Sequence, residues 1–359
     1  MTSELLMFLD DKFKIIPERN NDNRDDSMRL MLMGFISLLS PSSSFLFLSL
    51  AKRTSVKQKI CSISNTAMMM TTTTTNTTTN QQEQEQKQKR ALLLKATREF
   101  YERHSDLIKE SHGMLHVQKV YDHACHAVEA LKNDNTARPL SSDETFEIET
   151  AALLHDLDDD KYFPISSGAT GEGSKNYATL YPNAVELMKE AKIHESSYEN
   201  VLFMIDAVSC SKNGNSVPDR VVKNNSYHLL IPRFSDRIEA VGARGVTRCY
   251  QYNSEKNFPL CNPGLTPQPK SIDELWTYVT PERFEQYMIT NGKTIDNSMI
   301  GHYYDKLLHV ACPPQNIVQN KYLEDKLKDS AKELVEVCLR YGRTGIVDED
   351  YIQSFKDEE

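Results

Sequence analysis

An adjacent histidine and aspartate end an apolar helical run in the middle of this chain. The segment Thr150–Asp159 reads TAALLHDLDD, so His155 and Asp156 follow two leucines. Neighbouring residues on a helix point about 100° apart, and both side chains can therefore reach one metal ion at the helix end. A metal ion needs more than two protein ligands, so the others must come from other segments.

Two flanking segments offer those ligands. His112 and His116 lie one helical turn apart upstream in HGMLH, and Asp236 lies downstream in FSDRIEAVG. Two imidazoles and two carboxylates suit a divalent cation, with Mn²⁺ or Mg²⁺ expected first and Fe²⁺ or Zn²⁺ also compatible. Four protein ligands on a six-coordinate ion leave two positions for water and substrate, so the predicted site is open and catalytic.

Three sequence blocks, together with the upstream histidines, resemble a known family. HDLDDDK (His155–Lys161) resembles its His-Asp-x-x-Asp-x-Lys block, DRIEAVGARGVTR (Asp236–Arg248) resembles a second block, and HYYDKLL (His302–Leu308) resembles a third. The family is the HD superfamily of metal-dependent phosphohydrolases, in particular a subgroup that includes bacterial nucleotide pyrophosphohydrolases. The blocks occur in the family's order and cover roughly residues 91–345.

The resemblance implies a set of metal ligands. They are His116, His155, Asp156 and Asp236, and His112 is either the alternative to His116 or a residue that orients it or a phosphate. Asp159, about one turn beyond His155, is expected to orient or deprotonate the attacking water.

The resemblance also implies basic residues for an anionic substrate. Lys161 is expected at the catalytic centre, and the predicted substrate-binding residues are His112, Lys212, Arg248, His302 and Lys306. Cations at such positions stabilise charge that develops on phosphoryl oxygens. For Lys212 and Lys306, a solvated surface lysine is the competing interpretation.

The implied activity is hydrolysis of a small phosphorylated substrate by metal-activated water, with nucleoside triphosphates cleaved to monophosphate and pyrophosphate. The alternatives are a nucleoside monophosphate phosphatase and a catalytically silent ligand-binding module. A di-iron oxygenase needs extra histidines between the dyad and Asp236, where only His194 and His228 occur. One departure from the family pattern is Arg244, which stands where the motif usually has an apolar residue.

Composition limits the partners. The 359-residue chain has a net charge of −9, which disfavours nucleic-acid binding because such binding relies on clustered Lys and Arg. The seven cysteines show no Cys-x-x-Cys spacing, as expected in a reducing, intracellular compartment. The expected partner is a small anionic phosphate compound, and the oligomeric state is left open.

Residues 1–90 differ in composition from the rest. Met28–Asn80 contains no Asp or Glu, and the tracts Thr71–Asn80 and Gln81–Arg90 are too polar to form a core. Residues 28–80 read first as an organelle-targeting segment, then as a disordered extension of a cytoplasmic protein. A membrane anchor ranks third, because Ser40–Ser44 interrupts the apolar stretch.

From residue 91 onward, apolar residues recur at three- and four-residue steps, which predicts an all-α HD helical bundle. The predicted domains are a low-complexity extension (1–90), the HD domain (91–345) and an acidic tail (346–359), with a Pro-rich linker at Asn253–Asp273. Helices are predicted at Leu115–Leu131, Glu147–Leu157, Ala184–Ala191, Tyr198–Cys210, Pro232–Tyr252, Pro281–Tyr287, Ser298–Ala311 and Lys321–Tyr341, with polar loops at Ser166–Lys175 and Ser211–Asn225.

Overall fold

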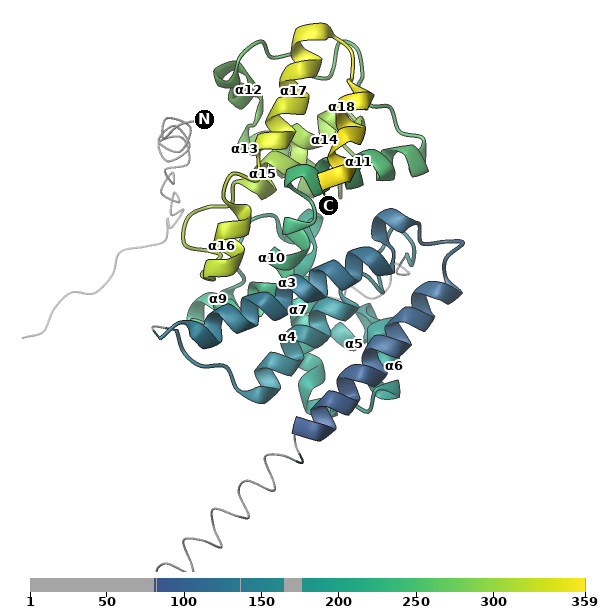
Figure 1. The fold of residues 1–359 in the computed structure, drawn as a ribbon, viewed down its shortest axis with the longest axis vertical. Coiled ribbons are helices and arrows are strands. Elements are labelled where there is room, and N and C mark those ends of the chain that lie inside the picture. Colours follow the sequence, from purple (N-terminus) through teal and green to yellow (C-terminus); the bar gives the residue numbers. More distant parts are fainter. Residues whose placement is uncertain (1–80, 82, 136, 165–175, 359) are drawn as a thin grey trace, which may run out of the picture. The chain divides into compact units, whose positions relative to one another are not determined.

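The structure is a computed structural model that describes residues 81, 83–135, 137–164 and 176–358. The segment predicted to act in targeting and the loop predicted at Ser166–Lys175 lie outside the described residues. All regular elements in the described part are helices, as Figure 1 shows, so the all-α prediction is confirmed. No helix in this part combines the length and the apolar character needed to cross a bilayer.

The helices fall into two groups along the chain, residues 83–224 and residues 227–358. After a helix over residues 83–103, the first group is η1 (Glu110–His112), α3 (Met114–Asn133), α4 (Ser142–Leu154), α5 (Tyr177–Leu180), α6 (Pro182–Glu190), η2 (Glu195–Ser197), α7 (Tyr198–Val208), α8 (Cys210–Asn213) and α9 (Asp219–Asn224). The second group is η3 (Tyr227–Leu230), α10 (Ile231–Ile238), α11 (Gly242–Lys256), α12 (Ile272–Tyr278), α13 (Pro281–Ile289), α14 (Met299–His302), the π-helical turn η4 (Tyr303–Leu307), α15 (Leu308–Ala311), α16 (Lys321–Leu327), α17 (Lys332–Thr344), α18 (Glu349–Ser354) and η5 (Phe355–Glu358).

Helix α4 forms the centre of the core because its sequence is apolar on nearly all sides. Ile148 and Leu154 are fully buried, and α4 packs against α3, α7 and α10. Its start is defined by a capping box, in which the Ser141 hydroxyl accepts a hydrogen bond from the Glu144 amide at 3.1 Å and the Glu144 carboxylate accepts one from the Ser141 amide at 2.8 Å. The core therefore holds the end of α4, where the His-Asp dyad lies, in a fixed position.

The first helix is attached to α4 by side chains that precede residue 91. Arg90 forms an ion pair with Glu149, and Gln86 donates a hydrogen bond to Asp143 at 3.0 Å.

We expect a protein truncated to residues 81–359 to fold, and further truncation to residues 91–359 to lower its free energy of unfolding by about 1 kcal/mol. That is the upper range for an ion pair near the surface. Urea denaturation of the two truncated proteins measures the difference, and Arg90→Ala in the longer one should reproduce most of it. Equal stability of the two proteins would contradict the structural role of these contacts.

The single helix predicted at Pro232–Tyr252 is wrong, because the chain breaks between α10 and α11. Gly242 adopts a left-handed conformation with φ of 66°, which side-chain-bearing residues rarely adopt. A Cβ atom on Gly245 would lie 2.4 Å from the Ala240 backbone, so the chain turns back closely on itself here. Because of this break, α11, which carries Arg248, runs in a different direction from α10, which carries Asp236.

Three further predictions need correction. The helix predicted at Lys321–Tyr341 is divided into α16 and α17, with Asp329 at a φ of 63° between them. The loop predicted at Ser211–Asn225 contains α9 and most of α8. The stretch predicted as an acidic tail forms α18 and η5, which pack against α11 and bury Ile352 and Phe355.

Candidate functional site

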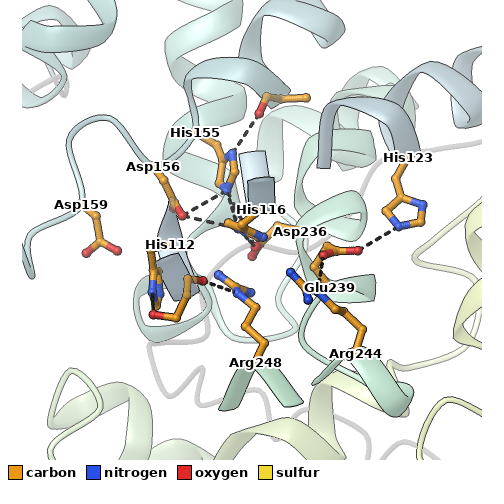
Figure 2. Close-up of polar contacts among 12 residues, drawn as sticks. His112, His116, His123, His155, Asp156, Asp159, Asp236, Glu239, Arg244 and Arg248 are labelled. Atoms are coloured by element: carbon orange, nitrogen blue, oxygen red, sulfur yellow. Dashed lines mark hydrogen bonds and ion pairs between the residues drawn. The ribbon is translucent and has the colours of Figure 1, made fainter. Parts of the chain in front are cut away.

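Four predicted ligands converge from α3, α10 and the end of α4 (Figure 2). His116 lies in the first turn of α3, His155 is the C-cap residue of α4 and Asp156 follows it, and Asp236 lies near the end of α10. These three helices pack against one another, so their packing determines the spacing of the ligands.

The donor atoms of these residues lie close together. The Nε2 atoms of His116 and His155 are 3.3 Å apart. Asp156 Oδ2 is 3.5 Å from His116 Nε2 and 3.4 Å from His155 Nε2. Asp236 Oδ1 is 3.3 Å and 3.8 Å from the same two nitrogen atoms. In Figure 2 the two carboxylates lie on either side of the imidazole pair.

These spacings match those around a bound cation. An ion about 2.1 Å from each donor places neighbouring donors roughly 3.0 Å apart in an octahedron and roughly 3.4 Å apart in a tetrahedron. His116, His155 and Asp156 each present one donor atom within 4.8 Å of the others, and Asp236 contacts both imidazoles. The first three donors are close enough to share one divalent ion, and Asp236 lies next to them through its contacts with both imidazoles.

The orientation of the histidines also fits a metal. The Nδ1 atom of His155 lies 2.9 Å from the Ala152 carbonyl oxygen, so Nδ1–H donates there and the Nε2 lone pair faces the other ligands. Both imidazoles are fully buried, whereas 18% of the Asp156 side chain and 25% of the Asp236 side chain are exposed. The carboxylate side of the site is therefore the side that water and substrate can reach.

Electrostatics within the cluster favour a positive charge at its centre. Burial alone would raise the pKa of Asp156 and of Asp236, but the two histidines hold both values below the usual range. Burial alone would lower the pKa of His155, yet the two carboxylates raise it to about 9. A divalent cation would satisfy the same carboxylates without a proton on His155, so the donor set fits a metal ion.

The three aspartates after the dyad have different surroundings. Asp158 accepts hydrogen bonds at 3.0 Å from the backbone amides of Asn183 and Ala184, and thereby caps the start of α6. The Asp159 carboxylate accepts hydrogen bonds from the Lys161 backbone amide at 2.9 Å and from the Lys161 ammonium at 3.0 Å. Asp160 pairs with Lys212 at 3.2 Å. Lys212 is therefore tied to the loop that follows the dyad.

His112 lies beside the four ligands but faces a different group. Its Nε2 atom is 3.2 Å from Lys161 Nζ, and its Nδ1 atom is 3.1 Å from the Ser111 hydroxyl. Burial, followed by the charges of Lys161 and Arg248, lowers the pKa of His112 well below its usual value. A neutral ring then accepts from Lys161 and donates to Ser111, whose carbonyl accepts from Arg248 Nε at 2.6 Å. Figure 2 shows Arg248 directed toward His112.

His302 is the last residue of α14, and Lys306 lies in the π-helical turn η4 that follows, a type of element often found at functional sites. The His302 ring lies 5.6 Å from the ring of Tyr287 on α13, and Lys306 Nζ lies 5.9 Å from the same ring. Burial alone would lower the pKa of Lys306, but Tyr287 and Cys210, with the Asp236 charge, raise it. The Lys306 ammonium is thus within electrostatic reach of Asp236.

Two histidines with lowered pKa values make stability depend on pH. Burial lowers the pKa of His302 to about 3, helped by Lys306 and Lys161, and burial lowers the pKa of His309 to about 4. In the folded protein both rings stay neutral from pH 6.5 down to about pH 4. In the unfolded chain the same two histidines take up protons below pH 6.5. The stability that they contribute is present above pH 6.5 and is lost as the pH falls.

We expect His302→Gln to reduce the loss of unfolding free energy between pH 6.5 and pH 5 by about 1.6 kcal/mol in total. Urea denaturation at the two pH values measures this. His309→Gln, on the core side of α15, should give a change of the same sign. An unaltered pH dependence in both variants would contradict the burial of neutral imidazoles.

Several residues at the site were missed by the sequence analysis. Tyr287 belongs to an amphipathic helix and had no motif around it, and Glu239 and His123 were not singled out as a pair. His194, by contrast, caps η2 by accepting from the Ser196 amide at 3.2 Å, away from the four ligands. His228 lies 3.6 Å from Glu144, at the opposite end of α4 from the dyad.

Comparison with known proteins gives a relative in a virus. No family model matches the chain. The uncharacterized protein L803 of Acanthamoeba polyphaga mimivirus is 32% identical over 250 residues, which are 68% of this chain and 92% of the viral protein. The chain belongs to the same family as L803.

Solved structures similar to this chain come from bacteria. A Lactobacillus plantarum protein is 18% identical, with a TM-score of 0.43, over 76% of this chain and 96% of its own. Bacillus subtilis YpgQ in complex with ADP is 20% identical, with a TM-score of 0.35, over 67% and 90%. An HD-superfamily hydrolase from Bacillus thuringiensis is 19% identical, with a TM-score of 0.33, over 75% and 97%.

Proposed function

We propose that this chain, like the family its sequence blocks resemble, is a metal-dependent phosphohydrolase with a single metal held by His116, His155, Asp156 and Asp236. The observation that carries the proposal is the convergence of four donor atoms, with nitrogen–nitrogen and nitrogen–oxygen separations of 3.3–3.8 Å. Mn²⁺ or Mg²⁺ suits the two carboxylates best, and Fe²⁺ or Zn²⁺ also suits the imidazoles.

The bound ion would polarise a phosphoryl oxygen and lower the pKa of a coordinated water. Asp159, on the loop beside Asp156, would orient this water or accept its proton. The Lys161 ammonium lies 3.0 Å from the Asp159 carboxylate and would also donate a hydrogen bond to a substrate oxygen. Asp159 and Lys161 are therefore the residues assigned to the chemical step.

The substrate would be a small compound that carries several phosphate charges. Arg248, Lys212 and Lys306 supply positive charge around the exposed carboxylate side, and His112 and His302 would donate or accept hydrogen bonds as neutral rings. Together with a bound divalent ion, these cations favour a nucleoside triphosphate that is cleaved to monophosphate and pyrophosphate. Tyr287, beside His302 and Lys306, adds an aromatic wall to the same region.

A product screen tests this proposal. The protein is incubated with nucleoside mono-, di-, tri- and cyclic phosphates in Mn²⁺, Mg²⁺ or chelator, and orthophosphate and pyrophosphate are measured separately. We expect metal-dependent release of pyrophosphate from triphosphates. Release of orthophosphate from monophosphates would replace the pyrophosphohydrolase assignment with a nucleotidase. No product with metal bound would replace it with a ligand-binding module.

A further inference from the structure

A buried carboxylate lies directly behind the metal ligands. Only 4% of the surface of Glu239 is exposed, and its carboxylate contacts two side chains that can donate hydrogen bonds. Glu239 Oε1 is 3.2 Å from His123 Nε2, and Oε2 is 3.2 Å from Arg244 Nε. His123 in turn contacts the Tyr322 hydroxyl through Nδ1 at 2.7 Å. Figure 2 shows the chain of contacts from His123 through Glu239 to Arg244.

These contacts join the same helices that supply the ligands. Glu239 is the C-cap residue of α10, one turn beyond Asp236. His123 lies on α3 two turns beyond His116, and residues at that spacing share a helix face. The Glu239–His123 contact therefore lies beside the Asp236–His116 contact, between the same two helices.

The third neighbour extends this connection to α11. Arg244 lies in the first turn of α11, the helix that carries Arg248, and it bridges the break after α10. Burial alone would raise the pKa of Glu239, but His123, His116 and Arg244 lower it, so the side chain is anionic. The charged residue at position 244, where the related motif usually has an apolar one, thus has a partner in the structure.

We propose that Glu239 is a positioning residue for the metal centre, which sets metal affinity by holding α10 and α3 in register and by placing a negative charge behind His116. This inference rests on the proposed metal site. Residues that hydrogen-bond metal ligands from behind change metal affinity by about 10–100-fold when they are removed. Glu239 contacts α3 through His123 rather than through His116 itself, so we expect an effect at the lower end of that range.

The test is Mn²⁺ binding to the full chain, measured by calorimetry, together with thermal unfolding of each variant in chelator. Glu239→Gln keeps the shape and one acceptor for His123 but removes the charge, and Glu239→Ala removes both. Glu147→Gln is the matched control, because Glu147 on α4 is equally buried and bonded to Asn200 at 2.9 Å but lies two turns before the dyad.

We expect the Mn²⁺ dissociation constant to rise about 10-fold in Glu239→Gln and by more in Glu239→Ala, and to stay unchanged in Glu147→Gln. Hydrolysis by Glu239→Gln should recover at high Mn²⁺, because the residue acts through the metal rather than on the substrate. Unchanged affinity in both Glu239 variants, or an equal loss in Glu147→Gln, would overturn the inference. If the wild type binds Mn²⁺ and Glu239→Gln binds it weakly, but neither hydrolyses any phosphate compound, the positioning role stands and the proposed activity fails.

Discussion

Asp236→Asn should lose stoichiometric metal and lower phosphate hydrolysis by about 10³-fold or more. Asparagine retains an oxygen near the position 3.3 Å from His116 Nε2, but it lacks the negative charge that a divalent cation needs. A catalytic metal contributes several kcal/mol of transition-state stabilisation, and each 1.4 kcal/mol corresponds to a factor of ten in rate. Metal content by mass spectrometry and turnover at saturating substrate measure the two effects.

The matched control is Asp158→Asn, on the same loop as Asp156. Asp158 caps α6 through two backbone amides at 3.0 Å and is not among the four ligands. We expect this variant to be less stable by about 1 kcal/mol but to bind one metal ion as the wild type does. Full metal content in Asp236→Asn, or loss of metal in Asp158→Asn alone, would contradict the ligand assignment.

Asp159→Asn should keep the metal and lower turnover by about 10²–10⁴-fold. This range is typical for the loss of a general base or of a residue that orients the attacking water. Asp159 lies on the loop that follows Asp156, and its carboxylate contacts the Lys161 ammonium, which also contacts His112. Because the change affects the chemical step rather than substrate binding, we expect the effect in kcat with little change in KM.

Asp160→Asn separates this role from a general loss of charge on the loop. Asp160 pairs with Lys212 at 3.2 Å, so its replacement removes one carboxylate while Asp159 and Lys161 stay in place. We expect a change of only a few-fold, and mainly in KM. If Asp159→Asn retains wild-type turnover, the base must be another group, and Lys161 or a second water would be the next candidate.

The convergence of His116, His155, Asp156 and Asp236 could be predicted from the sequence because these residues stand next to strong local signals. The apolar run before His155 indicates a buried helix end, and the blocks around Asp156 and Asp236 occur in a recognisable order. The packing of α3, α4 and α10 then accounts for the 3.3–3.8 Å spacings, which no periodicity in one segment specifies.

The remainder of the site depends on contacts between distant segments. The break after α10 needs a left-handed Gly242, and GARG inside a helical pattern does not distinguish a break from a tolerated glycine. The pairing of Glu239 with His123 joins residues far apart in the sequence. Tyr287 reaches His302 only because α13 packs against the π-helical turn.

The most direct test of the metal centre is anomalous X-ray scattering at the manganese edge from crystals of the protein grown with Mn²⁺. We predict one strong peak within about 2.3 Å of donor atoms from His116, His155, Asp156 and Asp236. A single peak at another position, or no peak between these side chains at full Mn²⁺ concentration, would contradict the proposed metal-dependent hydrolase.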